Sequence, residues 1–114
     1  MLYLFIGEDE PAKQEKIHSL KSELLKKGFE DFNYEAFYAK ELTLPTLKEA
    51  LSRLPVESPQ RIMVIKDVFR LQDKLKDYFI VKIEKLPKDL IIILEAAVIP
   101  KEESAFFNKI SRYG

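Results

Sequence analysis

Three short runs of almost wholly apolar residues constrain the fold of this chain more than any other feature. They are Leu2–Ile6, Ile62–Ile65 and Leu90–Leu94. A strand with one face in water alternates apolar and polar residues, whereas a strand covered on both faces is apolar throughout. The runs therefore predict three buried strands in a sheet that carries helices on both sides.

A fourth segment, Phe32–Tyr38, alternates instead. Phe32, Tyr34, Ala36 and Tyr38 share one face, and Asn33, Glu35 and Phe37 share the other. This alternation is typical of a half-exposed strand. We therefore predict a strand at the edge of the sheet.

Helical periodicity occupies the segments between these strands. It covers Pro11–Lys27, Pro45–Leu54, Leu71–Leu86 and a short segment from about Glu102. Strand and helix thus alternate four times, which predicts a single α/β domain with three αβα layers, a mainly parallel sheet and right-handed crossovers. A fifth strand would normally follow the last helix, so we expect residues 1–114 to be a fragment of a longer chain with the last strand missing.

The composition narrows the classes of function. The 19 basic and 19 acidic residues cancel, whereas proteins that bind nucleic acid directly usually have a basic excess. The absence of cysteine excludes disulfides, thiol catalysis and cysteine-ligated metals. No apolar stretch approaches the ~20 residues of a membrane span, so we expect a cytoplasmic protein without a membrane contact.

The turn after the first strand has the spacing of a phosphate-binding loop but not its chemistry. An active loop has glycine, four residues, glycine, lysine, and then serine or threonine. Gly7 and Lys13 match, but Ala12 replaces the second glycine and Gln14 replaces the hydroxyl residue. Pro11 removes an N–H donor, and each of the three preceding acidic residues would repel a polyanion by about 1–4 kcal/mol. We therefore expect a degenerate loop that binds no nucleotide.

The second element of a nucleotide-hydrolysing site, an acidic pair at the end of a central strand, is also missing. Lys66 and Asp67 follow the run Ile62–Ile65, so a lysine stands where the metal-binding acid belongs. The only histidine, His18, lies within a predicted helix and is expected at the surface. We therefore predict no catalytic residue, no metal and no cofactor.

Three segments resemble the DNA polymerase III delta subunit, a clamp-loader family. Leu2–Glu10 is similar to that family's opening strand and Gly-Glu-Asp loop. Leu54–Ile65 is similar to its Leu-Pro segment, which leads through serine and arginine into an apolar strand, and Pro87–Leu94 is similar to the next strand. The resemblance covers essentially the whole chain but only the N-terminal domain of the family. It implies the P-loop NTPase fold of the AAA+ ATPases with a degenerate phosphate loop.

The resemblance also implies an order of strands and a function. The strand at Leu2 is expected beside the one at Leu90, followed by the strand at Ile62 and, at the edge, the one at Phe32. In that family this domain grips the sliding clamp and helps open it during DNA replication, without ATP hydrolysis of its own. The implied partners are the clamp and, through the rest of the chain, other clamp-loader subunits. DNA is expected to be contacted only indirectly.

The clamp-binding candidates that the resemblance implies are Leu54, Pro55, Val56, Glu57 and Ser58. The family inserts an apolar pair that follows the proline into a clamp pocket, and this pair aligns with Val56 and Glu57. The charge of Glu57 departs from the exposed aromatic expected at such a pocket. Either the clamp surface compensates, or Leu54 and Val56 make the contact, or the loop aligns differently. The alternative to a binding role is that Leu54, Pro55 and Val56 form an ordinary exit from the helix, with their apolar side chains buried.

A signalling receiver domain is the alternative from another class of function. That fold also alternates strand and helix, with an acidic pair after the first strand and a phospho-accepting aspartate after the third. Asp9 and Asp67 match these positions and could bind magnesium through their carboxylates. Lys66 and the lack of a fifth strand with its lysine count against this reading.

Overall fold

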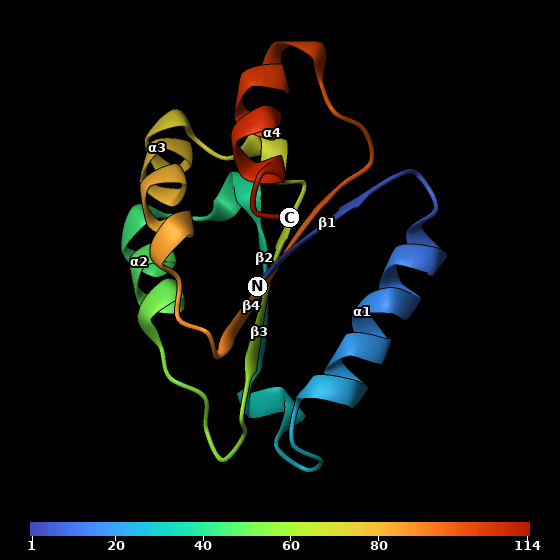
Figure 1. The fold of residues 1–114 in the computed structure, drawn as a ribbon. Coiled ribbons are helices and arrows are strands. Elements are labelled where there is room, and N and C mark those ends of the chain that lie inside the picture. Colours follow the sequence, from blue (N-terminus) through green and yellow to red (C-terminus); the bar gives the residue numbers. More distant parts are fainter.

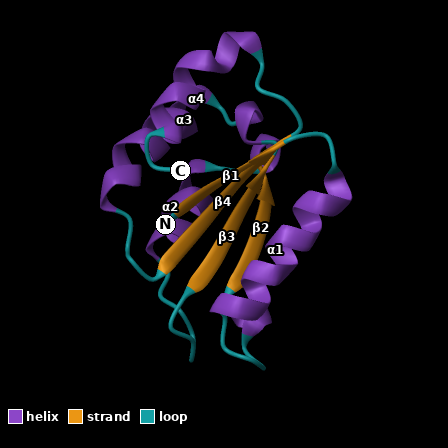
Figure 2. Ribbon diagram, turned by 45° about the vertical axis from the view of Figure 1, so that its right-hand side comes forward, coloured by secondary structure: helices purple, strands orange, loops and turns teal.

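The computed structural model describes residues 1–114 and contains one sheet with helices on both faces (Figure 1). Its strands are β1 (Leu2–Ile6), β2 (Tyr34–Tyr38), β3 (Arg61–Lys66) and β4 (Leu90–Ala96). They lie in the order β1-β4-β3-β2, as seen in the fan of strands in Figure 2. Every pairing is parallel. The expected order is confirmed, with the alternating strand β2 at one edge and the sheet entirely rather than mainly parallel.

The helices divide unequally between the two faces of the sheet. They are α1 (Glu10–Leu24), α2 (Leu44–Ser52), α3 (Asp73–Lys82) and α4 (Ser104–Ser111). In Figure 1, α1 lies alone on one side of the sheet, while α2, α3 and α4 lie on the other. The predicted three-layer αβα arrangement is therefore confirmed. None of these helices has the length and apolarity needed to cross a lipid bilayer.

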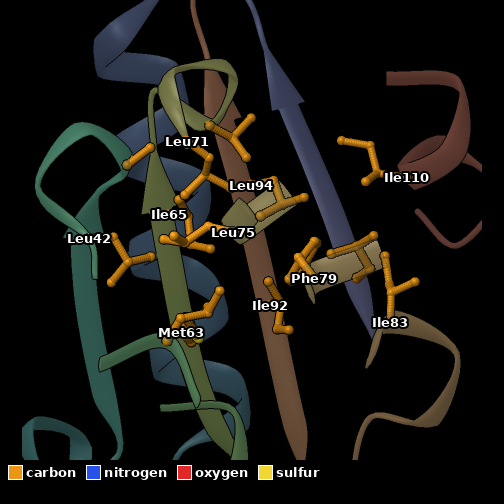
Figure 3. Close-up of a cluster of buried hydrophobic side chains, with 14 of the residues drawn as sticks. Leu42, Met63, Ile65, Leu71, Leu75, Phe79, Ile83, Ile92, Leu94 and Ile110 are labelled. Carbon is orange, nitrogen blue, oxygen red and sulfur yellow. The ribbon is translucent and has the colours of Figure 1, made fainter. Parts of the chain in front are cut away.

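Two hydrophobic clusters explain why the central residues of β3 and β4, Ile62–Ile65 and Leu90–Leu94, are all apolar. Met63, Ile65, Ile92 and Leu94 point toward α2, α3 and α4, where they join a cluster of 20 buried residues (Figure 3). The alternating residues between them point toward α1 and join a cluster of six. Because both faces of these strands are covered, polar residues occur only near the strand ends, at Arg61, Lys66 and Glu95.

Several predicted boundaries differ from the structure, and α2 spans Leu44–Ser52 rather than Pro45–Leu54. Helix α1 ends at Leu24 rather than Lys27, because Leu25 adopts an extended backbone and its side chain is buried in the cluster under α1. Helix α3 begins at Asp73 and ends at Lys82, and a 3-10 turn continues the helical path to Lys85. Strand β2 begins at Tyr34, because Phe32 ends a 3-10 turn.

Candidate functional site

The connection from β1 to α1 starts the helix with an acidic cap. The Asp9 side chain accepts a hydrogen bond from the Ala12 N–H at 3.1 Å, and Pro11 occupies the first helical turn. Proline is tolerated there because the N–H groups of the first turn have no partner within the helix. A carboxylate at this end also complements the helix dipole. Asp9 and Glu10 thus stabilise the start of α1, which is the part of the chain that has the spacing of a phosphate-binding loop.

Lys13, the lysine of the predicted phosphate loop, forms ion pairs with two carboxylates of the same chain. Lys13 is 6% exposed, and its Nζ donates to the Glu95 carboxylate and, at 2.9 Å, to Glu10 Oε1. Burial alone would lower the pKa of Lys13, but the hydrogen bonds and charges of Glu95 and Glu10 outweigh burial and raise this pKa above its usual value. Lys13 therefore remains a cation whose charge is balanced within the protein.

Glu95 connects three elements at the carboxyl edge of the sheet. It lies near the end of β4 and is 6% exposed. One carboxylate oxygen accepts from Lys13 of α1, and Oε1 accepts the Asp67 N–H, which follows β3, at 3.1 Å. Our sequence analysis did not identify Glu95 as a site residue. The available signal was a single acid near the end of an otherwise apolar run.

Only three of the four residues of the predicted degenerate phosphate loop line a common cavity. Gly7, Ala12 and Lys13 line one open cavity of about 250 Å³, together with Asp9. Gln14 instead faces a neighbouring polar cleft of about 350 Å³. Gln14 thus lies apart from the cavity that holds the other loop residues.

The two aspartates of the receiver alternative have other partners. Asp9 caps α1, and the Asp67 carboxylate pairs with Arg70 Nε at 3.1 Å. Nowhere in the chain do three or more histidine, aspartate or glutamate side chains gather in a group that could hold a metal ion. The carboxylates therefore do not form the magnesium cluster that this alternative requires.

The segment Leu54–Ser58 lies at the opposite, amino edge of the sheet, in the connection from α2 to β3. Leu54 is 71% exposed and Val56 is 45% exposed. Glu57 has a left-handed backbone with φ 52°. An ordinary helix exit with buried apolar side chains is therefore wrong, because both apolar side chains face solvent.

Side-chain hydrogen bonds hold this exposed segment in place. Asn33 Oδ1 accepts the Val56 N–H at 2.6 Å, and Asn33 Nδ2 donates to the Val56 carbonyl oxygen at 2.7 Å. Ser58 Oγ accepts the Lys26 N–H at 3.1 Å and donates to the Gln60 carbonyl at 2.9 Å. Residues of the loop between α1 and β2 thus hydrogen-bond to the segment and fix its position.

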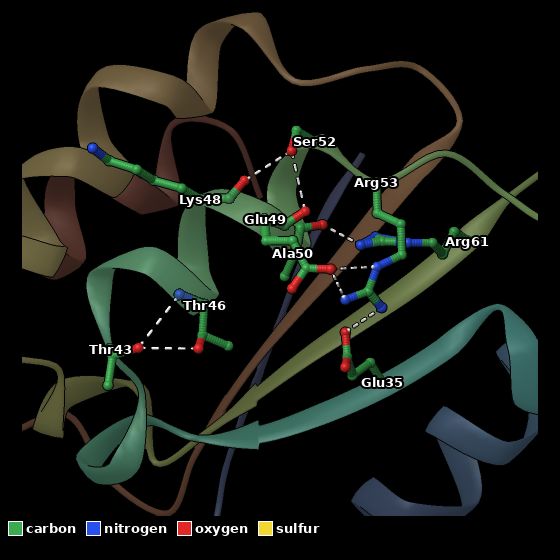
Figure 4. A network of polar contacts seen from close by, with 9 residues as sticks. All are labelled: Glu35, Thr43, Thr46, Lys48, Glu49, Ala50, Ser52, Arg53 and Arg61. Carbon is green, nitrogen blue, oxygen red and sulfur yellow. Dashed lines mark hydrogen bonds and ion pairs between the residues drawn. The ribbon is translucent and has the colours of Figure 1, made fainter.

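Two arginines fix the start of the segment (Figure 4). Arg53 Nη1 donates to Glu35 Oε1 at 2.8 Å, and Arg53 Nη2 donates to Glu49 Oε1 at 2.6 Å, so the end of α2 is joined to β2. Arg61, only 2% exposed, donates to the Ala50 carbonyl in the last turn of α2. Burial and the nearby charge of Arg53 lower the pKa of Arg61. A cation at this helix end complements the helix dipole.

A comparison with models of known protein families shows which family the chain belongs to. The family model described as DNA polymerase III, delta subunit, matches residues 3–111. The chain belongs to this family. The expected family relationship is therefore confirmed, and the receiver alternative has no comparable support. No curated protein matches this delta-family chain significantly.

Two solved structures share the fold of this delta-family chain. The DNA clamp loader delta protein of Bacillus subtilis superposes with a TM-score of 0.83 at 16% identity, over 99% of this chain and 36% of that protein. A DNA polymerase III gamma subunit-related protein of Thermotoga maritima superposes with a TM-score of 0.74 at 16% identity, over 99% of this chain and 38% of that protein. This chain thus spans little more than a third of the structures it matches, and their likeness confirms an AAA+-like fold.

Proposed function

We propose that this chain is the domain of a clamp-loader delta subunit that binds the sliding clamp and helps open it during DNA replication. One observation carries the proposal. In a member of the delta family, the segment Leu54–Ser58 presents two apolar side chains to solvent from a loop that hydrogen bonds hold in place. An exposed apolar pair on a fixed loop is suited to insertion into a pocket of a partner.

The exposures favour Leu54 and Val56 as the residues that contact the clamp. Burial of one such side chain in a pocket is worth roughly 1.5–3 kcal/mol, so the pair can supply a useful part of the binding free energy. Glu57 is exposed beside them and is assigned to the polar rim of the contact, where a charge costs little. This assignment accounts for a charge at the position that the family resemblance aligns with an apolar residue.

The same domain is proposed to bind and hydrolyse no ATP. The ammonium that would contact a nucleotide phosphate is engaged by Glu95 and Glu10. ATP binding would require Lys13 to exchange these carboxylates for phosphate next to the acidic N-terminus of α1. The work of clamp opening is accordingly assigned to ATP bound by neighbouring clamp-loader subunits, which bind the rest of the delta chain, and DNA is contacted through the complex.

The proposal is tested by titrating the full-length delta protein with the sliding clamp of the same organism. The Val56→Asp variant places a charge in the contact, and we expect it to abolish saturable binding. Val98→Asp is the matched control, since Val98 is 56% exposed and lies beyond the carboxyl end of β4, at the other edge of the sheet. Binding that survives Val56→Asp would move the contact elsewhere. Absence of binding by the folded wild-type protein would refute the function.

A further inference from the structure

We propose that Asn33 is a positioning residue for clamp binding, which holds the loop that carries Leu54 and Val56 in its binding conformation without touching the clamp. The inference rests on the proposed function and extends it to a residue outside the resembling segments. Asn33 precedes β2, is fully buried, and lies 23 positions before Val56 in the chain. Its role would therefore be indirect and exerted through Val56.

The Asn33 side-chain amide provides both an acceptor and a donor to the backbone of a single residue, Val56. Its Oδ1 accepts from the Val56 N–H at 2.6 Å, while its Nδ2 donates to the carbonyl oxygens of Val56 at 2.7 Å and Phe29 at 2.8 Å. The Asn33 backbone is fixed as well, because its N–H donates to the Glu30 carbonyl and its carbonyl accepts the Ile62 N–H. Val56 is thus linked through Asn33 to Ile62 at the start of β3.

The loop has no backbone hydrogen bonds that could replace this support. Residues 54–60 take part in none of the backbone–backbone hydrogen bonds of the chain, neither in helices and strands nor in turns. Besides Asn33, the loop is held by Ser58, whose contact with the Lys26 N–H is exposed to solvent. Asn33 is therefore the buried support of a loop whose own backbone lacks internal bonds.

Pre-organisation is the physical link between Asn33 and the clamp. Ordering a flexible loop on binding costs conformational entropy, and a loop that is fixed beforehand binds more tightly because this cost has already been met. Loss of Asn33 should leave Leu54 and Val56 chemically intact but free to sample many conformations. We therefore expect weaker clamp binding without any change in the contacting side chains.

The test uses the full-length delta protein with Asn33→Ala and Asn33→Asp. Alanine removes all three hydrogen bonds, and aspartate is isosteric but places a carboxylate against two carbonyl oxygens. We expect each variant to weaken clamp binding by about tenfold or more, as lost pre-organisation predicts. Hydrogen exchange at the Val56 amide should accelerate in both variants, while the amides of β3 and β4 stay protected.

A control separates loop positioning from general stability. Phe79→Leu in α3 alters the core of 20 buried residues without removing any hydrogen bond of Asn33 or Val56, and it should lower the melting temperature without changing clamp affinity. Unchanged affinity in a folded Asn33 variant, alongside lost affinity in Val56→Asp, would overturn the positioning role and leave the proposed function intact. Clamp binding that falls equally in Phe79→Leu would reduce Asn33 to a stabilising residue. Absence of binding by the wild-type protein would overturn both proposals.

Discussion

Lys13 of α1 and Glu95 of β4 form an ion pair in which both side chains are less than a tenth exposed. The pair joins a residue of the predicted phosphate loop to the strand beside it, across 82 positions of the sequence. Nucleotide-binding proteins reserve such a lysine for phosphate. Here Lys13 contacts a carboxylate of the same chain, so that it links α1 to the sheet.

Glu95→Gln should lower the free energy of unfolding by up to about 3 kcal/mol, because the buried Lys13 is then left with only the exposed Glu10 carboxylate as a charged partner. The glutamine can still accept the Asp67 N–H, so the variant removes the charge with little other change. Urea denaturation measures the effect. The double variant Lys13→Met with Glu95→Gln should lose less than the sum of the single variants, by about 1 kcal/mol or more. Additive losses would contradict an energetic coupling between the two residues.

Because Lys13 is already paired with Glu95, restoring the sequence motif of a phosphate-binding loop should not restore ATP binding. Isothermal titration of the wild-type protein with Mg-ATP should detect no binding tighter than about 1 mM. The double variant Ala12→Gly with Gln14→Thr restores the motif but keeps Glu95 and Pro11, so we expect it to remain inactive as well. An ATP-binding clamp-loader subunit of the same organism serves as the positive control. Micromolar binding by the wild-type chain would contradict the expectation.

The strand arrangement could be predicted because its causes are local and repetitive. Runs such as Ile62–Ile65 have no polar positions, and this pattern alone requires cover on both faces. The alternation in Phe32–Tyr38 likewise predicted an edge strand, although the strand itself begins at Tyr34. The order of strands came from the family resemblance, since hydrophobic pattern does not determine which buried strands are neighbours.

The contacts at the two edges of the sheet could not be predicted, because they depend on register and on side chains distant in sequence. Glu95 reaches Lys13 only because β1 and β4 are neighbours with Phe5 paired to Glu95. Asn33 was assigned to a strand, whereas its side chain serves the loop at Val56. The end of α1 at Leu24 follows from the burial of Leu25, which is a tertiary effect.

Glu57 provides a test of backbone strain in the proposed clamp-binding segment. Its φ of 52° lies in the left-handed region, which disfavours residues with a Cβ and suits glycine. Glu57→Gly should therefore raise the free energy of unfolding by about 0.5–1 kcal/mol. Glu57→Ala is the matched control, because it removes the same charge but keeps the Cβ and should not stabilise. Equal effects of the two variants in urea denaturation would assign the change to charge instead.

Tyr34 should make the stability of the domain sensitive to alkaline pH. Burial raises the pKa of Tyr34 above its usual value of 10.0, because the half-buried phenol resists ionisation. The folded chain therefore holds this proton more tightly than the unfolded chain, so the contribution is complete below pH 10.0 and disappears as the pH rises through the folded pKa. The raised pKa of Lys13 acts in the same direction. Tyr34→Phe should consequently reduce the loss of unfolding free energy above about pH 10 without abolishing it.

Urea denaturation at several pH values measures this slope for the wild-type protein and for Tyr34→Phe. Tyr38→Phe, which changes an exposed tyrosine of the same strand, controls for the loss of a phenolic hydroxyl. If Tyr34→Phe and the wild type lose stability in parallel, the phenol of Tyr34 ionises alike in the folded and unfolded chains. The alkaline sensitivity would then have to come from another group with a raised pKa, such as Lys13 or Tyr113, and the slope in Lys13→Met would test the first of these.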